Sequence, residues 1–243
     1  MQPNGNSNLF SPSEELAHLR LLHLADSALP IGSLSHSFGL ETLVSLDMLA
    51  AGDLPEFLHG YLQEAGMLEA VACREAFLLA GGGGETFDAR RWIAINDYLS
   101  ALKPARESRT ASATLGRNFL HAVLGLGDFP ALRAAREASL ESASLIHQSA
   151  AFGLVSAAMG FEEARAVPAY LHQMSASLVS ACQRLLPLGQ NEATRILWNL
   201  KPAIVEVFVR SAGYTLETVS CTTPLLDWGA MEHPALSTRL FIS

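Results

Sequence analysis

Apolar residues recur every three or four positions along most of this 243-residue chain, which is the pattern of amphipathic helices. The clearest stripe consists of Leu171, Met174, Leu178, Cys182 and Leu185. It predicts a core helix that ends before Pro187, because proline cannot continue a helix. A second stripe runs from Ile196 to Phe208, and Pro202 inside it is expected to kink or split that helix.

Further helices are expected from the same spacing and from turn residues. They cover a leucine-rich stretch that ends near Pro30, a stretch from Asp53 through Ala72, and residues 87–102, 106–126 and 131–159. No run of four or more alternating β-branched residues occurs, and Gly81–Gly84 predicts a loop rather than a phosphate cradle. The sequence therefore predicts an all-α, single-domain helical bundle.

Three segments follow from this pattern. Residues 1–13 are expected to be a flexible N-terminal segment, and residues 14–218 the helical domain. Residues 219–243 carry Pro224 and Pro234 and are predicted to form an irregular C-terminal tail. The tail is rich in Leu, Trp, Met and Phe, so it either packs back on the domain or docks on another protein.

Composition narrows the class of protein. Apolar residues make up 49% and charged residues 16%, which is more apolar surface than a freely soluble monomer needs and favours a protein with partners. The net charge is −8 with Lys103 and Lys201 as the only lysines, which argues against nucleic-acid binding. No apolar run reaches the roughly 18 residues of a membrane span. We expect neither a nucleic acid nor a membrane as partner.

The cysteines and the N-terminal residues indicate the cellular compartment in which we expect the protein. Cys73, Cys182 and Cys221 are scattered and odd in number, so they do not form a disulfide framework. The polar start lacks the basic-then-apolar order of a signal peptide. Both features favour a reducing cytoplasm.

The stretch Gly32–Gly39 places serines beside His36 and invites comparison with a nucleophilic turn. A nucleophile elbow needs a glycine two residues on either side of the serine, and none of these serines has both. Adjacent Ser and His side chains also point in different directions. Simple serine hydrolysis is therefore not expected.

Two Glu-x-x-His spacings, Glu15 with His18 and Glu56 with His59, meet part of the pattern of a diiron carboxylate bundle. No inward-facing glutamates elsewhere complete that set, and acidic residues near helix starts already complement the helix dipole. No metal and no cofactor is expected.

Arg106, Arg109 and Arg117 fall on one helical stripe, with Ala113 between them. They form either a solvated face or a patch for an acidic partner. Both interpretations remain open from the sequence.

Four segments together resemble the UreF family of urease accessory proteins. They are the opening "LADSALPIGSLSHSFGLE", the mid-chain "ESRTASATLGR", the segment "LVSACQRLLPLGQNEATRIL" and the terminus "MEHPALSTRLFIS". Ser33 and Leu34 stand where a second glycine and an aromatic are usual, and Pro234 replaces a glutamate after His233. The last change removes a carboxylate. The resemblance runs from about Leu21 to Ser243.

The resemblance implies an all-α, homodimeric chaperone without catalytic activity. It implies that the chain acts with a UreD/UreH-type protein, recruits the GTPase UreG and helps deliver nickel to apo-urease. Residues expected at partner surfaces are Ser35, His36, Glu41, Arg106, Arg109, Arg117, His233, Arg239, Leu240 and Phe241. The competing class is an all-α enzyme, or a helical protein that binds a metal or small molecule, with a buried polar pocket.

Overall fold

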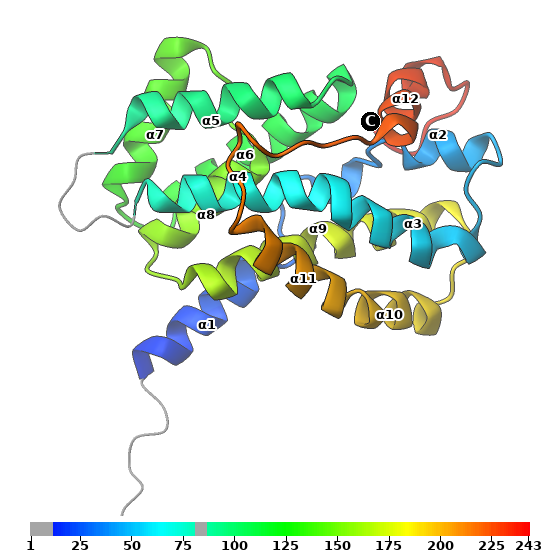
Figure 1. The fold of residues 1–243 in the computed structure, drawn as a ribbon, viewed down its shortest axis with the longest axis horizontal. Helices are drawn as coiled ribbons and strands as arrows, with labels where there is room; N and C mark the ends of the chain where they lie inside the picture. Colours follow the sequence, from blue (N-terminus) through cyan, green and yellow to red (C-terminus); the bar gives the residue numbers. More distant parts are fainter. Residues whose placement is uncertain (1–11, 81–86) are drawn as a thin grey trace, which may run out of the picture.

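The computed structural model describes residues 12–80 and 87–243, which form helices joined by short turns (Figure 1). The helices are α1 (Pro12–Leu24), α2 (Leu40–Ser45), α3 (Leu54–Tyr61), α4 (Met67–Leu78), α5 (Ala89–Leu102), α6 (Arg106–Leu124), α7 (Pro130–Ser142), α8 (Gln148–Ala158), α9 (Glu163–Leu185), α10 (Gln190–Asn199), α11 (Lys201–Ser211) and α12 (Pro224–Glu232). No β-strand occurs in the described ranges, so the predicted all-α class is confirmed. In the same ranges, no helix has the length and apolarity that a membrane span needs. The expected flexible segment (except its last two residues) and Gly81–Gly84 lie outside the described residues.

The core is built around α4 and α8, which lie side by side in the middle of the molecule (Figure 1). Residues 67–73 of α4 and 149–156 of α8 are buried almost all round. The two backbones approach closely because α8 has Gly153 at the contact. A Cβ atom there would lie 2.0 Å from the carbonyl oxygen of Cys73, so no other residue fits without moving a helix.

A buried histidine links three helices of this core. The backbone N–H of His147, just before α8, donates to Asn96 Oδ1 of α5 at 2.8 Å. Its ring nitrogens contact Ser100 Oγ of α5 at 2.9 Å and Ser112 Oγ of α6 at 3.0 Å. Burial, together with the nearby Lys103 ammonium, lowers the pKa of His147 to about 3. The imidazole is therefore neutral at physiological pH.

Several predicted helices are present with small shifts in their ends. The expected helix from Asp53 through Ala72 consists of α3, one π-helical turn (Leu62–Gly66) and α4. The predicted split at Pro202 is also present, because α10 ends at Asn199 and α11 begins at Lys201. Pro202 lies in the first turn of α11, where its missing N–H costs no hydrogen bond.

The single stretch predicted over residues 131–159 is wrong, because it contains two helices. α7 ends at Ser142, and Ala143 adopts a left-handed conformation with φ of 56°. The chain then turns, and α8 enters the core between α4 and α6. A left-handed alanine costs about 1–2 kcal/mol, so burial of α8 outweighs the local preference for a longer helix.

The tail is less irregular than the sequence predicts, because residues 224–232 form α12. Pro224 was expected to interrupt regular structure, but it occupies the first turn of this helix. Thr223 Oγ1 donates to Asp227 Oδ2 at 3.1 Å across that turn. Before α12, the chain crosses the bundle. Two hydrogen bonds hold it there, one from the Leu216 N–H to the Glu75 carboxylate and one from the Thr222 N–H to the Glu64 carboxylate.

Candidate functional site

The last residues of the chain return to its opening motif. The Ile242 N–H donates to the carbonyl of Ser35 at 2.9 Å, and the Ser37 N–H donates to the carbonyl of Ser243. His36 Nδ1 lies 2.7 Å from Ser243 Oγ. Burial lowers the pKa of His36 below its usual value, so the ring is neutral near pH 7. The Ser/His stretch therefore binds the C-terminus by backbone and side-chain hydrogen bonds.

Glu41, on the first turn of α2, holds the same segment from inside. Its carboxylate is buried and accepts hydrogen bonds from His233 Nε2 at 2.7 Å, from Phe241 N–H at 3.1 Å and from Leu240 N–H. Three donors offset the cost of taking a carboxylate out of water. We call the set Ser35, His36, Glu41, His233, Phe241 and Ser243 the C-terminal anchor.

A glycine pair lets α12 reach α2 and so positions the C-terminal anchor. Gly39, which precedes α2, has φ of 92°, a conformation that favours glycine. A Cβ there would lie 2.5 Å from the carbonyl oxygen of Leu226, and one on Gly229 would lie 2.8 Å from the carbonyl oxygen of Gly39. The two helices therefore cross backbone to backbone. Figure 1 shows α12 and the C-terminus beside α2.

Arg184 is a residue of this site that the sequence analysis missed. Its guanidinium lies over the Phe241 ring at 4.2 Å from the centroid and donates to the carbonyl of Leu34 at 2.7 Å. It thus joins the end of α9 to both the opening motif and the terminus. The signal was present, because Arg184 is the arginine of the "RLLPLGQ" segment that carries the family resemblance.

The apolar residues of the tail separate into two groups. Phe241 is buried at 5% exposure and packs back on the domain, which is one of the two alternatives that the sequence left open. Leu236 is half-buried, whereas Leu240 is exposed at 53% and Arg239 is also exposed. The C-terminal segment therefore packs into the core through Phe241 and presents Arg239 and Leu240 to solvent.

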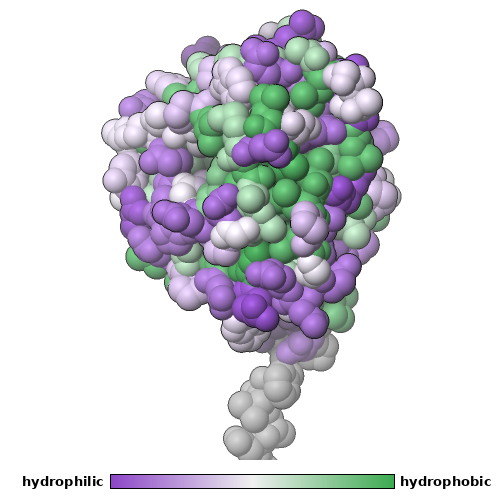
Figure 2. Space-filling view, turned by 90° about the vertical axis from the view of Figure 1, so that its right-hand side faces the viewer, coloured by the Kyte–Doolittle hydropathy of each residue, from purple (hydrophilic) through white to green (hydrophobic). Residues whose placement is uncertain are grey.

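An apolar surface surrounds the C-terminal anchor. Figure 2 faces this end of the molecule and shows apolar side chains gathered across it. Exposed large apolar residues of the nearby elements are Leu34, Leu46, Met48, Leu225, Trp228, Met231, Leu240 and Ile242. Contiguous apolar surface of this kind marks interaction sites more often than chance exposure.

The three arginines expected to form one stripe do not share one role. Arg109 donates to the carbonyl groups of Lys103 at 2.7 Å and Pro104 at 3.3 Å, so it caps the carboxyl end of α5. Arg106 is exposed at the start of α6. Arg117 is also exposed and lines a groove between α6 and α7. Helical spacing predicted that the three arginines share one face of α6, but it could not predict which groups each guanidinium contacts.

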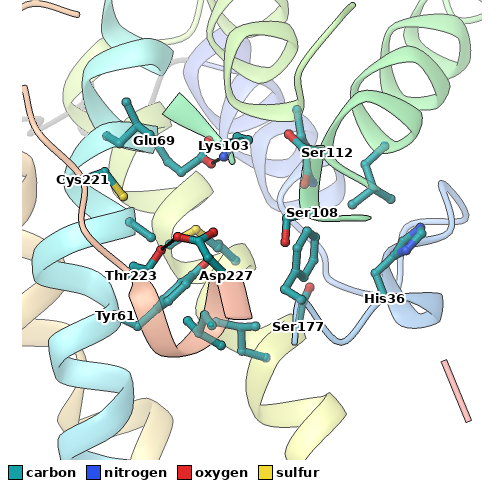
Figure 3. A pocket seen from close by; sticks show the side chains of 18 of the residues that line it. His36, Tyr61, Glu69, Lys103, Ser108, Ser112, Ser177, Cys221, Thr223 and Asp227 are labelled. Atoms are coloured by element: carbon teal, nitrogen blue, oxygen red, sulfur yellow. Dashed lines mark hydrogen bonds and ion pairs between the residues drawn. The ribbon is translucent and has the colours of Figure 1, made fainter. Parts of the chain in front are cut away.

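A polar cavity of about 80 Å³ lies between the helices, and His36 of the C-terminal anchor is among the residues that line it. Figure 3 shows Tyr61, Cys221, Thr223 and Asp227 on one side of it and Ser108, Ser112 and His36 on the other. Allowing about 10–15 Å³ for each water position, the cavity has room for several water molecules. It is the described region that best matches the buried polar pocket of the competing class.

The buried ion pair of Glu69 and Lys103 borders this cavity. Burial favours the neutral acid, but the Lys103 charge and hydrogen bond outweigh it and lower the pKa of Glu69. Tyr170 Oη donates to the same carboxylate at 3.4 Å. Burial also raises the pKa of Asp227 and raises that of Cys221 to about 11. The thiol is therefore protonated at neutral pH and is a poor nucleophile.

The two Glu-x-x-His pairs do not converge. Glu15 and His18 are exposed on α1, and Glu56 and His59 are exposed on α3. Across residues 12–80 and 87–243, no three His, Cys, Asp or Glu side chains come together in a group that could hold a metal ion.

The geometry defines an all-helical protein that fixes its last residues against its own opening motif. The sequence model of the UreF family matches residues 49–201. The chain is 31% identical over 237 residues to "Urease accessory protein UreF" of Methylobacterium radiotolerans, covering 96% of this chain and 99% of the relative. It is 30% identical to proteins of the same name from Rhodopseudomonas palustris (strain BisA53), over 92% of both chains, and from Actinobacillus pleuropneumoniae, over 92% of this chain and 97% of that one. The chain therefore belongs to the UreF family of urease accessory proteins.

Proposed function

We propose that this chain is the urease accessory subunit that, with a UreD/UreH-type protein, recruits the GTPase UreG for nickel insertion into apo-urease. One observation carries the proposal. Glu41 and Phe241 are 200 positions apart, yet the opening and closing motifs that carry the family resemblance meet in one anchor. The anchor holds Leu240 and Ile242 outward on an apolar surface. Such a surface suits a protein partner rather than a small substrate.

The exposed residues beside the C-terminal anchor supply the contacts of this interface. Leu240 and Ile242 are fixed on a segment whose backbone is already hydrogen bonded, so binding pays little ordering entropy. Trp228 on α12 adds an aromatic side chain of the kind that dominates interface energies. Arg239 offers a planar guanidinium for a partner carboxylate. We assign the UreD/UreH-type protein to this surface.

A pull-down of the purified chain with UreD/UreH, UreG and apo-urease tests the proposal. We expect Leu240→Asp and Arg239→Ala each to reduce retention of the UreD/UreH protein at least tenfold and to reduce urease activation in proportion. Leu126→Asp is the matched control, because Leu126 is also exposed, at 63%, but lies in the turn after α6. Equal retention by the Leu240 and Leu126 variants would contradict the assignment.

The proposal includes a cytoplasmic homodimer without catalytic activity or tight nickel binding of its own. We expect calorimetry to show no stoichiometric nickel binding at submicromolar affinity and no GTP hydrolysis by the isolated chain. Sedimentation should show a dimer at tens of micromolar. We expect the dimer interface to bury about 800 Å² per subunit. A persistent monomer would overturn the proposed homodimer. Nickel bound tightly in a one-to-one ratio would overturn the claim that this chain does not bind nickel tightly.

A second candidate function is a helical protein that binds a small molecule or metal in the polar cavity. The Glu69–Lys103 pair and the cavity beside it favour this alternative. Glu69→Gln separates the two functions. Loss of partner retention through Leu240→Asp alone supports the accessory subunit, whereas an activity or ligand that depends on Glu69 without any partner supports the alternative.

A further inference from the structure

A groove of about 570 Å³ lies between α6 and α7. In Figure 1, α7 lies at the left of the molecule and α12 at the right. Arg117 of α6 and Arg136 of α7 both line it, and both are exposed. Across residues 12–80 and 87–243, neither guanidinium forms an ion pair or a hydrogen bond. Arg133, one turn before Arg136 on α7, is by contrast paired with Asp128. The groove arginines therefore have their donors available.

The charge of this groove differs from that of the whole chain. The chain has a net charge of −8, but none of the residues that line the groove is acidic, and two of them, Arg117 and Arg136, are cationic. One carboxylate, Asp97, is tied to the lining residue Ser144 by a hydrogen bond of 2.8 Å. Because the protein as a whole is acidic, a groove with local positive charge attracts an anionic ligand to that one place on its surface.

Apolar side chains are interspersed with these arginines. Leu140 on α7 is 75% exposed, and Leu145 in the turn after α7 is 41% exposed. Ile146 is buried beneath them at 8% exposure. A free inorganic anion would leave these leucines in water, whereas an amphipathic helix covers them with its own leucines and places its carboxylates against the arginines.

We propose that the α6–α7 groove binds an acidic amphipathic helix of a partner protein, with Arg117 and Arg136 holding its carboxylates and Leu140 and Leu145 contacting its apolar face. The site goes beyond the proposed function, because it is separate from the C-terminal anchor. It can be measured on the isolated full chain, so its failure leaves the accessory function untouched.

The probe is a fluorescein-labelled synthetic peptide of about fifteen residues, with leucines at helical spacing and glutamates on both flanks. Fluorescence anisotropy should give a Kd of about 1–100 μM at low salt. We expect Arg117→Gln and Arg136→Gln each to weaken binding about fivefold and the double variant at least tenfold. Leu140→Ser and Leu145→Ser should also weaken it about fivefold, because each removes apolar contact.

Three matched controls make the test specific. Arg133→Gln removes the paired arginine of the same helix and should change the Kd less than twofold. Leu126→Ser removes an exposed leucine outside the groove and should behave likewise. A peptide with lysine in place of glutamate should not bind.

Three results would each overturn the proposal. The first is absence of peptide binding. The second is equal weakening by Arg133→Gln and Arg136→Gln, which would show a diffuse charge effect. The third is a change from dimer to monomer on sedimentation of the Arg117→Gln, Arg136→Gln variant, which would make a second copy of this chain the occupant.

Discussion

Two buried polar residues, Glu41 in the C-terminal anchor and His147 in the core, organise different parts of the molecule. The Glu41 carboxylate accepts three hydrogen bonds, whereas the His147 ring makes two and its backbone N–H a third. Glu41 accepts its bonds from His233, Leu240 and Phe241, in a segment that also carries exposed residues. His147 joins α5, α6 and the start of α8, which are held on several sides. The stability lost with such a residue therefore depends on whether its hydrogen-bond partners can become exposed to water.

The largest expected effect is that of His147→Ala. The change leaves the hydroxyls of Ser100 and Ser112 without their partner and opens a cavity among three helices. We expect a loss of about 3–5 kcal/mol in the free energy of unfolding, or a fall of about 10 °C in Tm, by thermal and urea unfolding. His59→Ala, exposed on α3, should change neither. A loss below about 1 kcal/mol would show that the imidazole does not support the core.

Glu41→Gln should have a smaller and more local effect. An amide cannot accept all three hydrogen bonds, so one donor is left unpaired, at a cost of about 1–3 kcal/mol. Detachment of the terminus limits that cost. Hydrogen exchange should show at least tenfold faster exchange at Leu240 and Phe241, with exchange in α4 nearly unchanged. Glu56→Gln on α3 is the control. Equal acceleration in α4 would mean that the anchor is part of the global core.

The pH dependence of stability tests the neutral state of His147. Its pKa is about 3 in the folded chain against about 6.5 unfolded. Such a group contributes stability that is complete above pH 6.5 and is lost as pH falls toward 3. We expect His147 to contribute a fall of about 1 kcal/mol in the free energy of unfolding between pH 6.5 and 5.5. Because burial also lowers the pKa of His36 and His172, the slope should be reduced in His147→Gln, not abolished. An unchanged slope would refute the assignment.

The smallest expected effects distinguish two arginines near the C-terminal anchor. Arg184→Gln removes the contact with the Phe241 ring and the bond to the Leu34 carbonyl, at a cost of about 0.5–1.5 kcal/mol. Arg239→Gln removes an exposed guanidinium and should change stability by less than about 0.5 kcal/mol. Thermal melting compares the two. A larger loss from Arg239→Gln would show that the exposed side of the segment also supports the fold.

Helical spacing predicted most of the fold, because apolar periodicity records which face of a segment is buried. It located the long helix before Pro187 and the split at Pro202. It missed the break at Ala143, because alanine favours a helix and only the docking of α8 in the core overrides that preference. It also missed α12, because a proline can either interrupt a helix or occupy its first turn, and Pro224 does the latter.

The sequence named the residues of the C-terminal anchor, but in another role. The family resemblance implies Ser35, His36, Glu41, His233 and Phe241 as partner-surface residues, whereas the structure brings all five together within the chain, with Glu41, His233 and Phe241 buried. Their contact with a partner stays a prediction. The motifs could not show that Glu41 accepts backbone N–H groups from the terminus, because any residue can supply such a donor. Arg109 likewise has the spacing of a partner-binding stripe but binds carbonyl groups of its own chain.

Periodicity and ordered motifs are properties of the chain read in one dimension, so they were enough to predict the helical class, the positions of most helices and the family. Tertiary packing sets which motif residues face one another, which tail residues are buried and which arginines keep their donors available. A hydrogen bond or a packed ring depends on distances between segments up to 200 positions apart. Those distances are fixed by close helix approaches such as Gly39 against α12, and no local pattern specifies them.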